Sequence, residues 1–334
     1  MSIPNGRPLS RRRFVEVAGS CAAHLAVLGA GAGPAAAEGW GRLGLRSTVR
    51  AAEPWGTLHE VAEGVWALVS DPFQDRTTLC NGGIVAGRSG VAVIEGFASP
   101  DGAAWMSGQA RDLTGRAPDV VVVTHHHSDH SRGLAGYFEG TDGPELRITE
   151  PTRERLRAGL TSMDPAAADA MAAAIDGALP QPPDGEVTFD LGGRRVRQVS
   201  RGGHTASDVT IELDDPPVVF CGDLVWNDMF PNYVDAVPSR LGRAVEALAA
   251  AGEDAVYVPG HGPLADGAAI ARYRRVISAV EEHARRAAAE GRSAAEAASD
   301  FEMPVASADW TLFSPSYFER ALEAWLKELN DGGE

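Results

Sequence analysis

The sequence predicts a layered α/β fold. The segment 119–124 is dominated by valine and ends in threonine, and β-branched side chains of this kind favour a strand over a helix. Upstream, the continuous apolar segment 91–94 predicts a buried strand, and residues 103–113 between the two predict a helix. Strand, helix and strand in this order are typical of a sheet that is covered by helices.

The other elements follow from apolar spacing and turn residues. Further strands are expected at 65–69, 83–86, 187–191, 195–199, 209–213, 218–221 and 255–258. Helices are expected over 152–180 and 239–250, and a loop is expected at 180–185, where three prolines fall together. Near the C-terminus, two apolar stripes at helical spacing predict helices that face the core. The stripes are Ile270, Tyr273, Ile277, Val280 and Ala284 in one helix, and Phe318, Leu322, Trp325 and Leu329 in the other.

Length and composition indicate one globular unit with an N-terminal extension. The chain has 334 residues, of which 44% are apolar and 23% charged, as in an ordinary folded protein. We expect an irregular arm at 38–57 and one folded domain at 58–334 that includes the C-terminal helices. The formal net charge of −16 repels phosphate groups, which argues against nucleic acid or an anionic membrane as partner. A small-molecule substrate is the expected partner.

The first 37 residues are interpreted as an export signal, outside the fold. Residues 10–15 (SRRRFV) resemble a twin-arginine motif, an Ala/Gly-rich apolar stretch follows, and 34–37 (PAAA) offer the small residues that a signal peptidase needs. Glu16 and His24 interrupt the stretch, so a stable membrane anchor is a poor fit. We expect export by the twin-arginine route to a periplasmic or extracellular location.

Cysteine usage does not indicate a disulfide framework. Of three cysteines, Cys21 lies in the N-terminal segment, which leaves Cys80 and Cys221 in the folded domain. We expect two small buried residues on strands, and a single disulfide between them is the alternative.

A histidine cluster directly follows the strand expected at 119–124. The run His125-His126-His127-Ser128-Asp129-His130 contains the pattern H-x-H-x-D-H. Alternate residues of an extended loop point the same way, so His125 and His127 can face one point in space, and Asp129 and His130 can face a second. Imidazole and carboxylate groups are suitable zinc ligands. His126 should face away from both points.

Three more candidate ligands stand at the ends of expected strands. His204 lies in G-G-H-T-A-S-D, Asp223 follows strand 218–221, and His261 follows strand 255–258 in P-G-H-G-P. Each alone has an ordinary structural explanation, such as a turn cap. Because α/β sheets gather their sites at strand ends, the three together with the H-x-H-x-D-H run predict a metal site.

The ordered set H-x-H-x-D-H, G-H-T, G-D and P-G-H-G resembles the metallo-β-lactamase superfamily, over about residues 58–265. The resemblance implies a four-layer αββα sandwich with its metals at one edge. It implies a first metal held by His125, His127 and His204, a second held by Asp129, His130 and His261, and a bridge by Asp223. Two zinc ions are implied, although iron or manganese suits the same ligands.

Such a site predicts hydrolysis. Two dications about 3.5–4 Å apart lower the pKa of a water held between them toward neutrality. Their charge outweighs that of two carboxylates and a hydroxide, and the positive remainder favours a carbonyl oxygen that becomes negative in the transition state. We expect attack on an ester, thioester, lactone or amide of a small substrate, with Asp129 also relaying a proton.

Two positions refine the resemblance. In the family, the strand at 91–94 commonly ends in Asp, whereas here it is followed by Glu95, which we expect to support the ligands at a different reach. Aspartate at position 223 resembles the glyoxalase II and lactonase branches more than the β-lactam-hydrolysing ones. Glyoxalase II grips glutathione with a basic C-terminal region, but the arginines after Ile270 are balanced by Glu281 and Glu282 and indicate a solvated face.

Several alternatives stay open at this level. They are a β-lactamase, a non-haem iron sulfur dioxygenase on the same fold, and a metal-binding protein without catalysis. Asp208 and Thr205 either support the site or cap a turn. The loops 71–78 and 225–237 are expected to shape the substrate pocket. Trp226, Phe230 and Tyr233 line that pocket or belong to the core, and His59 and His283 receive no role.

Overall fold

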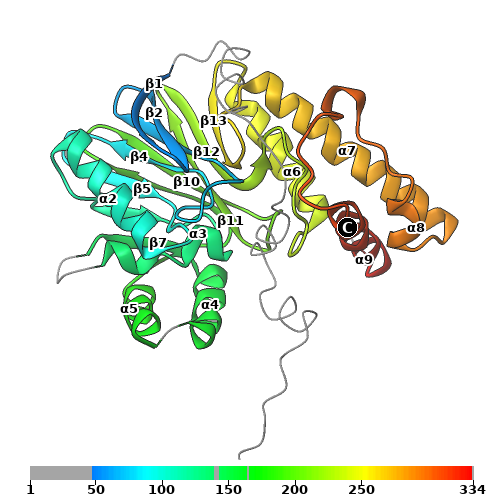
Figure 1. The fold of residues 1–334 in the computed structure, drawn as a ribbon, viewed down its shortest axis with the longest axis horizontal. Helices are drawn as coiled ribbons and strands as arrows, with labels where there is room; N and C mark the ends of the chain where they lie inside the picture. Colours follow the sequence, from blue (N-terminus) through cyan, green and yellow to red (C-terminus); the bar gives the residue numbers. More distant parts are fainter. Residues whose placement is uncertain (1–46, 139–142, 164, 333–334) are drawn as a thin grey trace, which may run out of the picture.

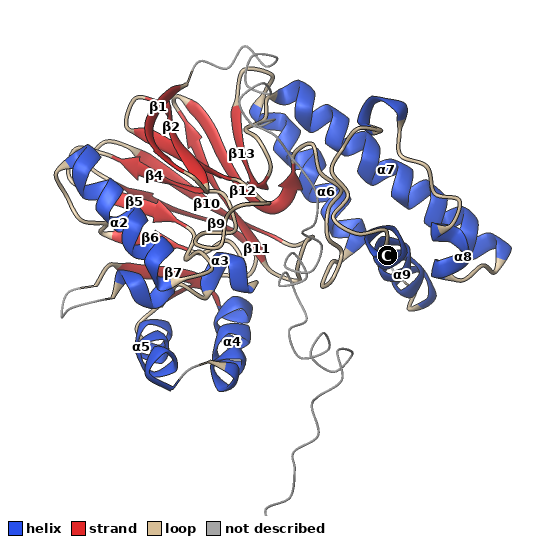
Figure 2. Cartoon of the chain, viewed as in Figure 1, coloured by secondary structure: helices blue, strands red, loops and turns tan. Residues whose placement is uncertain are grey.

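The computed structural model describes residues 47–138, 143–163 and 165–332, so the expected export signal at 1–37 lies outside the described residues. The strands form two sheets that face each other, and helices cover the outer side of each sheet (Figure 1). Figure 2 shows the same layers by element type, with the strands between two groups of helices. The implied four-layer αββα sandwich is therefore confirmed.

The first sheet has eight strands, and their order in the sheet follows the chain. They are β1 (Thr48–Glu53), β2 (Gly56–Ala62), β3 (Val65–Ser70), β4 (Gly82–Ala86), β5 (Val91–Ile94), β6 (Val120–Val122), β7 (Glu145–Thr149) and β8 (Leu179–Gln181). Neighbours are antiparallel from β1 to β5 and parallel from β5 to β8. Because parallel strands end at the same edge, the loops after β5 and β6 meet there, and the second of these loops carries the histidine cluster.

The second sheet has five strands in the order β13-β12-β11-β10-β9. They are β9 (Gly185–Asp190), β10 (Arg195–Arg201), β11 (Asp208–Asp214), β12 (Pro217–Trp226) and β13 (Val256–His261). β12 pairs with β13 in parallel, and the register shifts between Phe220 and Gly222 and again between Gly222 and Trp226. Asp223 lies in this irregular stretch, so its side chain is not fixed by regular pleating.

The helices follow the expected order. They are α2 (Pro100–Thr114), α3 (Ser128–Ser131), α4 (Glu150–Gly159), α5 (Pro165–Asp176), α6 (Pro238–Leu248), α7 (Gly267–Glu290), α8 (Ala294–Ala298) and α9 (Ser316–Asn330), with 3-10 turns at Leu134–Tyr137, Leu160–Ser162, Ala249–Ala251 and Val305–Ser307. α2 shows why its ends fall where they do: the Ser99 hydroxyl accepts from Gly102 N, and Gly115 ends the helix in the left-handed conformation. Within the described residues, no helix has the length and apolar character needed to cross a membrane.

Three clusters of buried apolar side chains separate the four layers. The strand β12 shows the arrangement, because its side chains alternate between two of them. Val218 and Phe220 point between the sheets, whereas Val219 and Cys221 belong to the cluster that contains Leu241 and other residues of α6, α7 and α9. The third cluster lies between the first sheet and the helices of its outer face, chiefly α2. Both faces of each sheet are thus covered by apolar groups, and polar groups gather at the strand ends.

Three expected segments are wrong in part. Residues 48–53 are not an arm but the edge strand β1, which is largely exposed and therefore shows no apolar alternation. The single helix expected over 152–180 is divided into α4 and α5, since Pro165 cannot continue the hydrogen-bonding of a preceding helix. Leu179–Gln181 form β8 instead of a loop, and Pro180 is tolerated because β8 is an edge strand.

The C-terminal segment between α8 and α9 returns to the end of β12. Thr311 N donates to Asp228 O at 3.0 Å, and Phe230 N donates to Thr311 O at 3.0 Å. Arg320 on α9 donates to Asn232 Oδ1 at 2.7 Å. The loop 227–237, which leads from β12 to α6, is therefore held by the C-terminal helices.

Candidate metal centre

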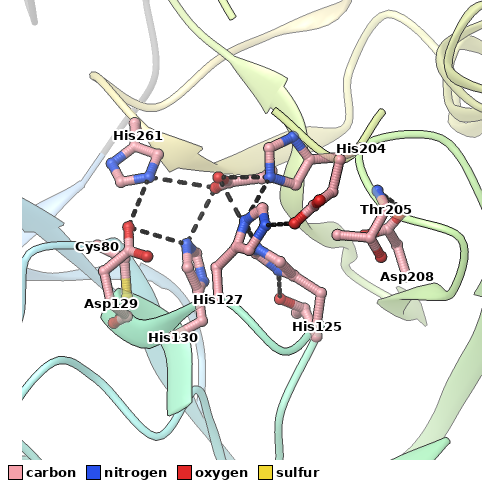
Figure 3. A network of polar contacts seen from close by, with 12 residues as sticks. Cys80, His125, His127, Asp129, His130, His204, Thr205, Asp208 and His261 are labelled. Carbon is pink, nitrogen blue, oxygen red and sulfur yellow. Dashed lines mark hydrogen bonds and ion pairs between the residues drawn. The ribbon is translucent and has the colours of Figure 1, made fainter. Parts of the chain in front are cut away.

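Three imidazole nitrogens converge at the edge of the sandwich. His127 Nδ1 lies 3.1 Å from His125 Nε2 and 2.9 Å from His204 Nε2 (Figure 3). All three side chains are buried. Nitrogens this close that all face one point are arranged as ligands of a single ion.

A second cluster lies beside the first. His261 Nε2 is 3.3 Å from Asp129 Oδ2, and His130 Nε2 is 3.6 Å from the same oxygen. These three side chains are also buried and can share one ion. Figure 3 shows His130 and His261 facing Asp129 on the side opposite His204.

Asp223 stands between the two clusters. Its Oδ2 lies 3.2 Å from His204 Nε2 and 3.8 Å from His125 Nε2. Its Oδ1 lies 3.0 Å from His130 Nε2 and 3.3 Å from His261 Nε2. One carboxylate oxygen thus faces each cluster, which is the geometry of a bridging ligand. The structure brings all seven residues singled out in the sequence to one place.

The local backbone structure of the H-x-H-x-D-H run directs its side chains toward two different clusters. His127 has extended backbone angles and precedes α3, whose first turn carries Asp129 and His130. The residues before the turn therefore face the first cluster, and those inside it face the second. Glycine is required opposite them, because a Cβ on Gly260 would lie 2.0 Å from Asp223 Oδ1.

The buried carboxylates fit a bound cation. Both oxygens of Asp223 and Oδ1 of Asp129 are buried, and among the described residues no backbone or hydroxyl group donates to them. A buried carboxylate costs on the order of several kcal/mol unless a positive charge compensates it. The atoms around these oxygens are imidazole nitrogens, so the donor set suits a first-row transition metal such as zinc.

The pKa shifts of the histidines in the two clusters also fit bound cations. Burial lowers the pKa of His204 to about 3, and burial together with the charge of nearby His130 lowers the pKa of His125 well below its usual value. Neutral imidazoles of this kind keep a lone pair for a metal. In the second cluster, burial opposes protonation, but the Asp223 charge and hydrogen bonds to Asp129 and Asp223 raise the pKa of His261 to about 9. The carboxylates there attract a positive charge, which a cation can supply.

Glu95 supports the second cluster from the loop after β5. Its Oε1 lies 3.0 Å from His130 Nδ1 and accepts from Thr124 Oγ1 at 2.6 Å. A ligating histidine whose other nitrogen meets a carboxylate is held in one orientation. Glu95 has φ of 85°, a left-handed backbone conformation that is unusual for glutamate. The expected supporting position of this residue agrees with its observed contacts.

Asp208 shapes the turn that presents His204. Its carboxylate accepts from Thr205 N and from Thr205 Oγ1, both at 2.9 Å. Burial raises the pKa of Asp208 to about 7 although these hydrogen bonds favour the charged form. Of the two roles left open for Asp208 and Thr205, the contacts show the turn directly.

The other candidates fall mostly into the core. Cys80 and Cys221 are buried free thiols, so the disulfide alternative is wrong. Cys221 lies on β12, whereas Cys80 precedes β4, and its thiol donates to Asp129 O at 3.1 Å. Trp226, Phe230 and Tyr233 are fully buried. Of these, Trp226 also packs against the candidate ligand His261, with ring centroids 4.2 Å apart.

Sequence reasoning missed Asp235, which lies in the loop 227–237. Its Oδ2 lies 2.9 Å from His127 Nε2 and 3.5 Å from His126 Nε2. Hydrogen bonds from His126 and His127 lower the pKa of Asp235, so the carboxylate is charged. A proton on His127 Nε2 satisfies this carboxylate and leaves Nδ1 free to face the first cluster. No motif marks Asp235, because its partner stands 108 residues earlier in the chain.

We expect Asp235→Ala to weaken zinc binding at the first cluster by about 10- to 100-fold, the usual cost of losing the carboxylate behind a ligating histidine. Asp235→Asn keeps an acceptor and should lose less. Zinc competition against a chelating dye measures the affinity, with Asp254→Ala on an exposed turn as the control. Equal zinc affinity in Asp235→Ala and the parent protein would show that His127 is oriented by other contacts.

The comparisons with known proteins agree with this geometry. The sequence profile of the Metallo-beta-lactamase superfamily matches residues 76–261, which include all seven residues of the two clusters and the bridge. The chain belongs to the metallo-beta-lactamase superfamily, and its buried His/Asp clusters could hold metal ions.

Among individual proteins, the chain is similar to a hydroxyacylglutathione hydrolase of Acidiphilium cryptum, at 30% identity over 165 residues, 49% of this chain and 59% of that protein. A hydroxyacylglutathione hydrolase of Brucella ovis is 28% identical over 152 residues, 46% of this chain and 51% of that protein. The chain thus spans between half and three-fifths of these curated relatives.

Solved structures show the same fold. The DIM-1 metallo-beta-lactamase superposes with a TM-score of 0.54 at 19% identity, covering 67% of this chain and 98% of that one. A metallo beta lactamase from Erythrobacter litoralis superposes with a TM-score of 0.52 at 20% identity, covering 68% and 98%. At these identities the likeness concerns the fold alone.

Proposed function

We propose that the protein is a dinuclear zinc hydrolase that cleaves an ester, thioester, lactone or amide bond of a small substrate. The observation that carries the proposal is the position of Asp223, whose two oxygens face two separate clusters of ligands. A site for one ion needs no such bridge. Bound zinc would polarise the substrate carbonyl and lower the pKa of an attacking water.

The residues of this chain would hold and orient the reacting groups. The first cluster presents three imidazole nitrogens and no carboxylate apart from Asp223, so it leaves positive charge of its ion available to the carbonyl oxygen. The second cluster contributes Asp129, whose Oδ1 is buried without a hydrogen-bond partner among the described residues. We assign to that oxygen the relay of a proton between the attacking water and the leaving group.

The bridging position of Asp223 and the names of the curated relatives favour one type of scissile bond in the substrate. A carboxylate at position 223, together with relatives named hydroxyacylglutathione hydrolases, favours a thioester or a related ester over a β-lactam. The superposed β-lactamases support the fold and do not bear on the substrate. We also propose that the SRRRFV motif at 10–15 directs export by the twin-arginine route, so that the enzyme acts in the periplasm or outside the cell.

Metal analysis combined with a hydrolysis panel tests the function. We expect about two zinc ions per chain by mass spectrometry, and turnover of thioesters or lactones that stops when a chelator removes the zinc and returns when zinc is restored. The panel includes β-lactams, phosphodiesters and an oxygen-uptake assay with a persulfide. Iron with oxygen consumption would replace the hydrolase by a redox enzyme, and metal without turnover of any panel substrate would contradict the proposed reactions.

A further inference from the structure

A polar cavity of about 550 Å³ lies beside the His204 loop. Its lining includes Gly202 and Ala206, which flank the ligand His204 by two residues on either side. The opposite wall is the first half of α6, with Arg240 and Arg243. The cavity is therefore built on the same loop that presents a ligand to the first cluster.

The cavity is lined by arginine in a chain of strongly acidic balance. Three arginines line it, Arg201, Arg240 and Arg243, against one acidic residue, Asp184. Arg201 is already paired, because its Nη2 lies 2.5 Å from Glu212 Oε1. Among the described residues, Arg240 and Arg243 have neither an ion pair nor a side-chain hydrogen bond. The lining thus holds two positive charges whose donors are not used within the described protein.

Arg240 is held against the backbone of the His204 loop. A Cβ on Gly202 would lie 3.4 Å from Arg240 Cδ and 3.5 Å from its Nη1, so the side chain lies over this glycine. Val237 N donates to Gly203 O at 2.9 Å, which fixes the start of α6 to the same loop. The start of α6, which carries Arg240, and the loop that carries His204 are thereby kept in one spatial relation.

Guanidinium groups bind carboxylates and phosphates through paired, charge-assisted hydrogen bonds. We propose that this pocket, defined by Gly202, Ala206, Arg240 and Arg243, binds a carboxylate or phosphate group of the substrate while the scissile bond lies at the metal centre. The inference rests on the proposed hydrolase function and adds to it that the substrate is anionic. The same chemistry also suits a free anion, and the experiment separates the two sources.

The kinetic arm uses the zinc-loaded enzyme and two synthetic thioesters that differ only in one distal carboxylate. In Arg240→Gln/Arg243→Gln, we expect kcat/KM for the anionic thioester to fall about tenfold, mainly through KM, while the neutral thioester changes less than about twofold. Arg111→Gln/Arg275→Gln removes the same charge from exposed positions outside the cavity and should change neither. Asp184→Asn should lower KM for the anionic thioester.

The binding arm titrates inorganic phosphate into the same proteins by calorimetry and does not depend on turnover. If Arg240→Gln/Arg243→Gln loses the preference for the anionic thioester, the pocket binds the anionic group of the substrate. Weaker phosphate binding in Arg240→Gln/Arg243→Gln, with the thioester preference kept, supports the anion site with a free anion as its occupant. If the substitution changes neither phosphate binding nor the preference, the inference is overturned. Failure of both thioesters to react would contradict the hydrolase function, and calorimetry would still decide the pocket.

Discussion

We expect His127→Ala to lose metal from the first cluster and to lower hydrolysis by more than about a hundredfold. This loss is larger than the one expected when only a hydrogen-bond partner of a metal ligand is removed. His127 Nδ1 lies at the centre of that cluster, within 3.1 Å of the facing nitrogens of both His125 and His204. Its removal leaves two nitrogens and one carboxylate oxygen, a set too small for tight binding. The fold should persist, because the apolar clusters between the layers do not include this residue.

The measurement compares zinc content, turnover and the thermal unfolding midpoint in the parent and the variant. His126→Ala is the matched control, because it makes the same change one residue away and should keep its zinc. His126 is partly exposed and belongs to neither of the clusters that Asp223 joins. Undiminished turnover in His127→Ala would be incompatible with the proposed centre.

The second large effect is expected for Asp223→Asn. The substitution keeps the size of the side chain but replaces the bridging carboxylate by a neutral amide. Both clusters then lose the anion that their ions share, so we expect metal content to fall from two ions per chain to one or fewer. Hydrolysis should fall by at least about a hundredfold, because a position with one ion lacks the second charge that acts on the reacting oxygen.

Metal stoichiometry by mass spectrometry, read together with turnover, checks this prediction. Asp254→Asn is the control, since it removes one carboxylate from an exposed turn and should leave both quantities unchanged. Retention of two ions and of full activity in Asp223→Asn would mean that the clusters bind metal independently. The bridging role would then be wrong, although the two clusters themselves would stand.

Much of the site was predictable because its ligands carry local signals. The H-x-H-x-D-H run follows a β-branched strand, and His204, Asp223 and His261 stand near or within strand ends in glycine-rich segments. Asp235 could not be predicted in the same way, because no motif marks it and its partner His127 lies 108 residues earlier in the chain. Elements without apolar contrast, such as the exposed strand β1, were also missed, because their hydrogen bonds rather than their side chains define them.

The sequence by itself determined the seven candidate ligands and the layered order of strands and helices, since chemical identity and apolar spacing are properties of the chain alone. Only the tertiary structure decided that Asp235 contacts His127, that the C-terminal segment is hydrogen-bonded to the loop 227–237, and that Arg240 lies over Gly202. The physical reason is distance along the chain. These contacts join residues that are far apart in the sequence and share no periodicity, so they exist only once the chain has folded.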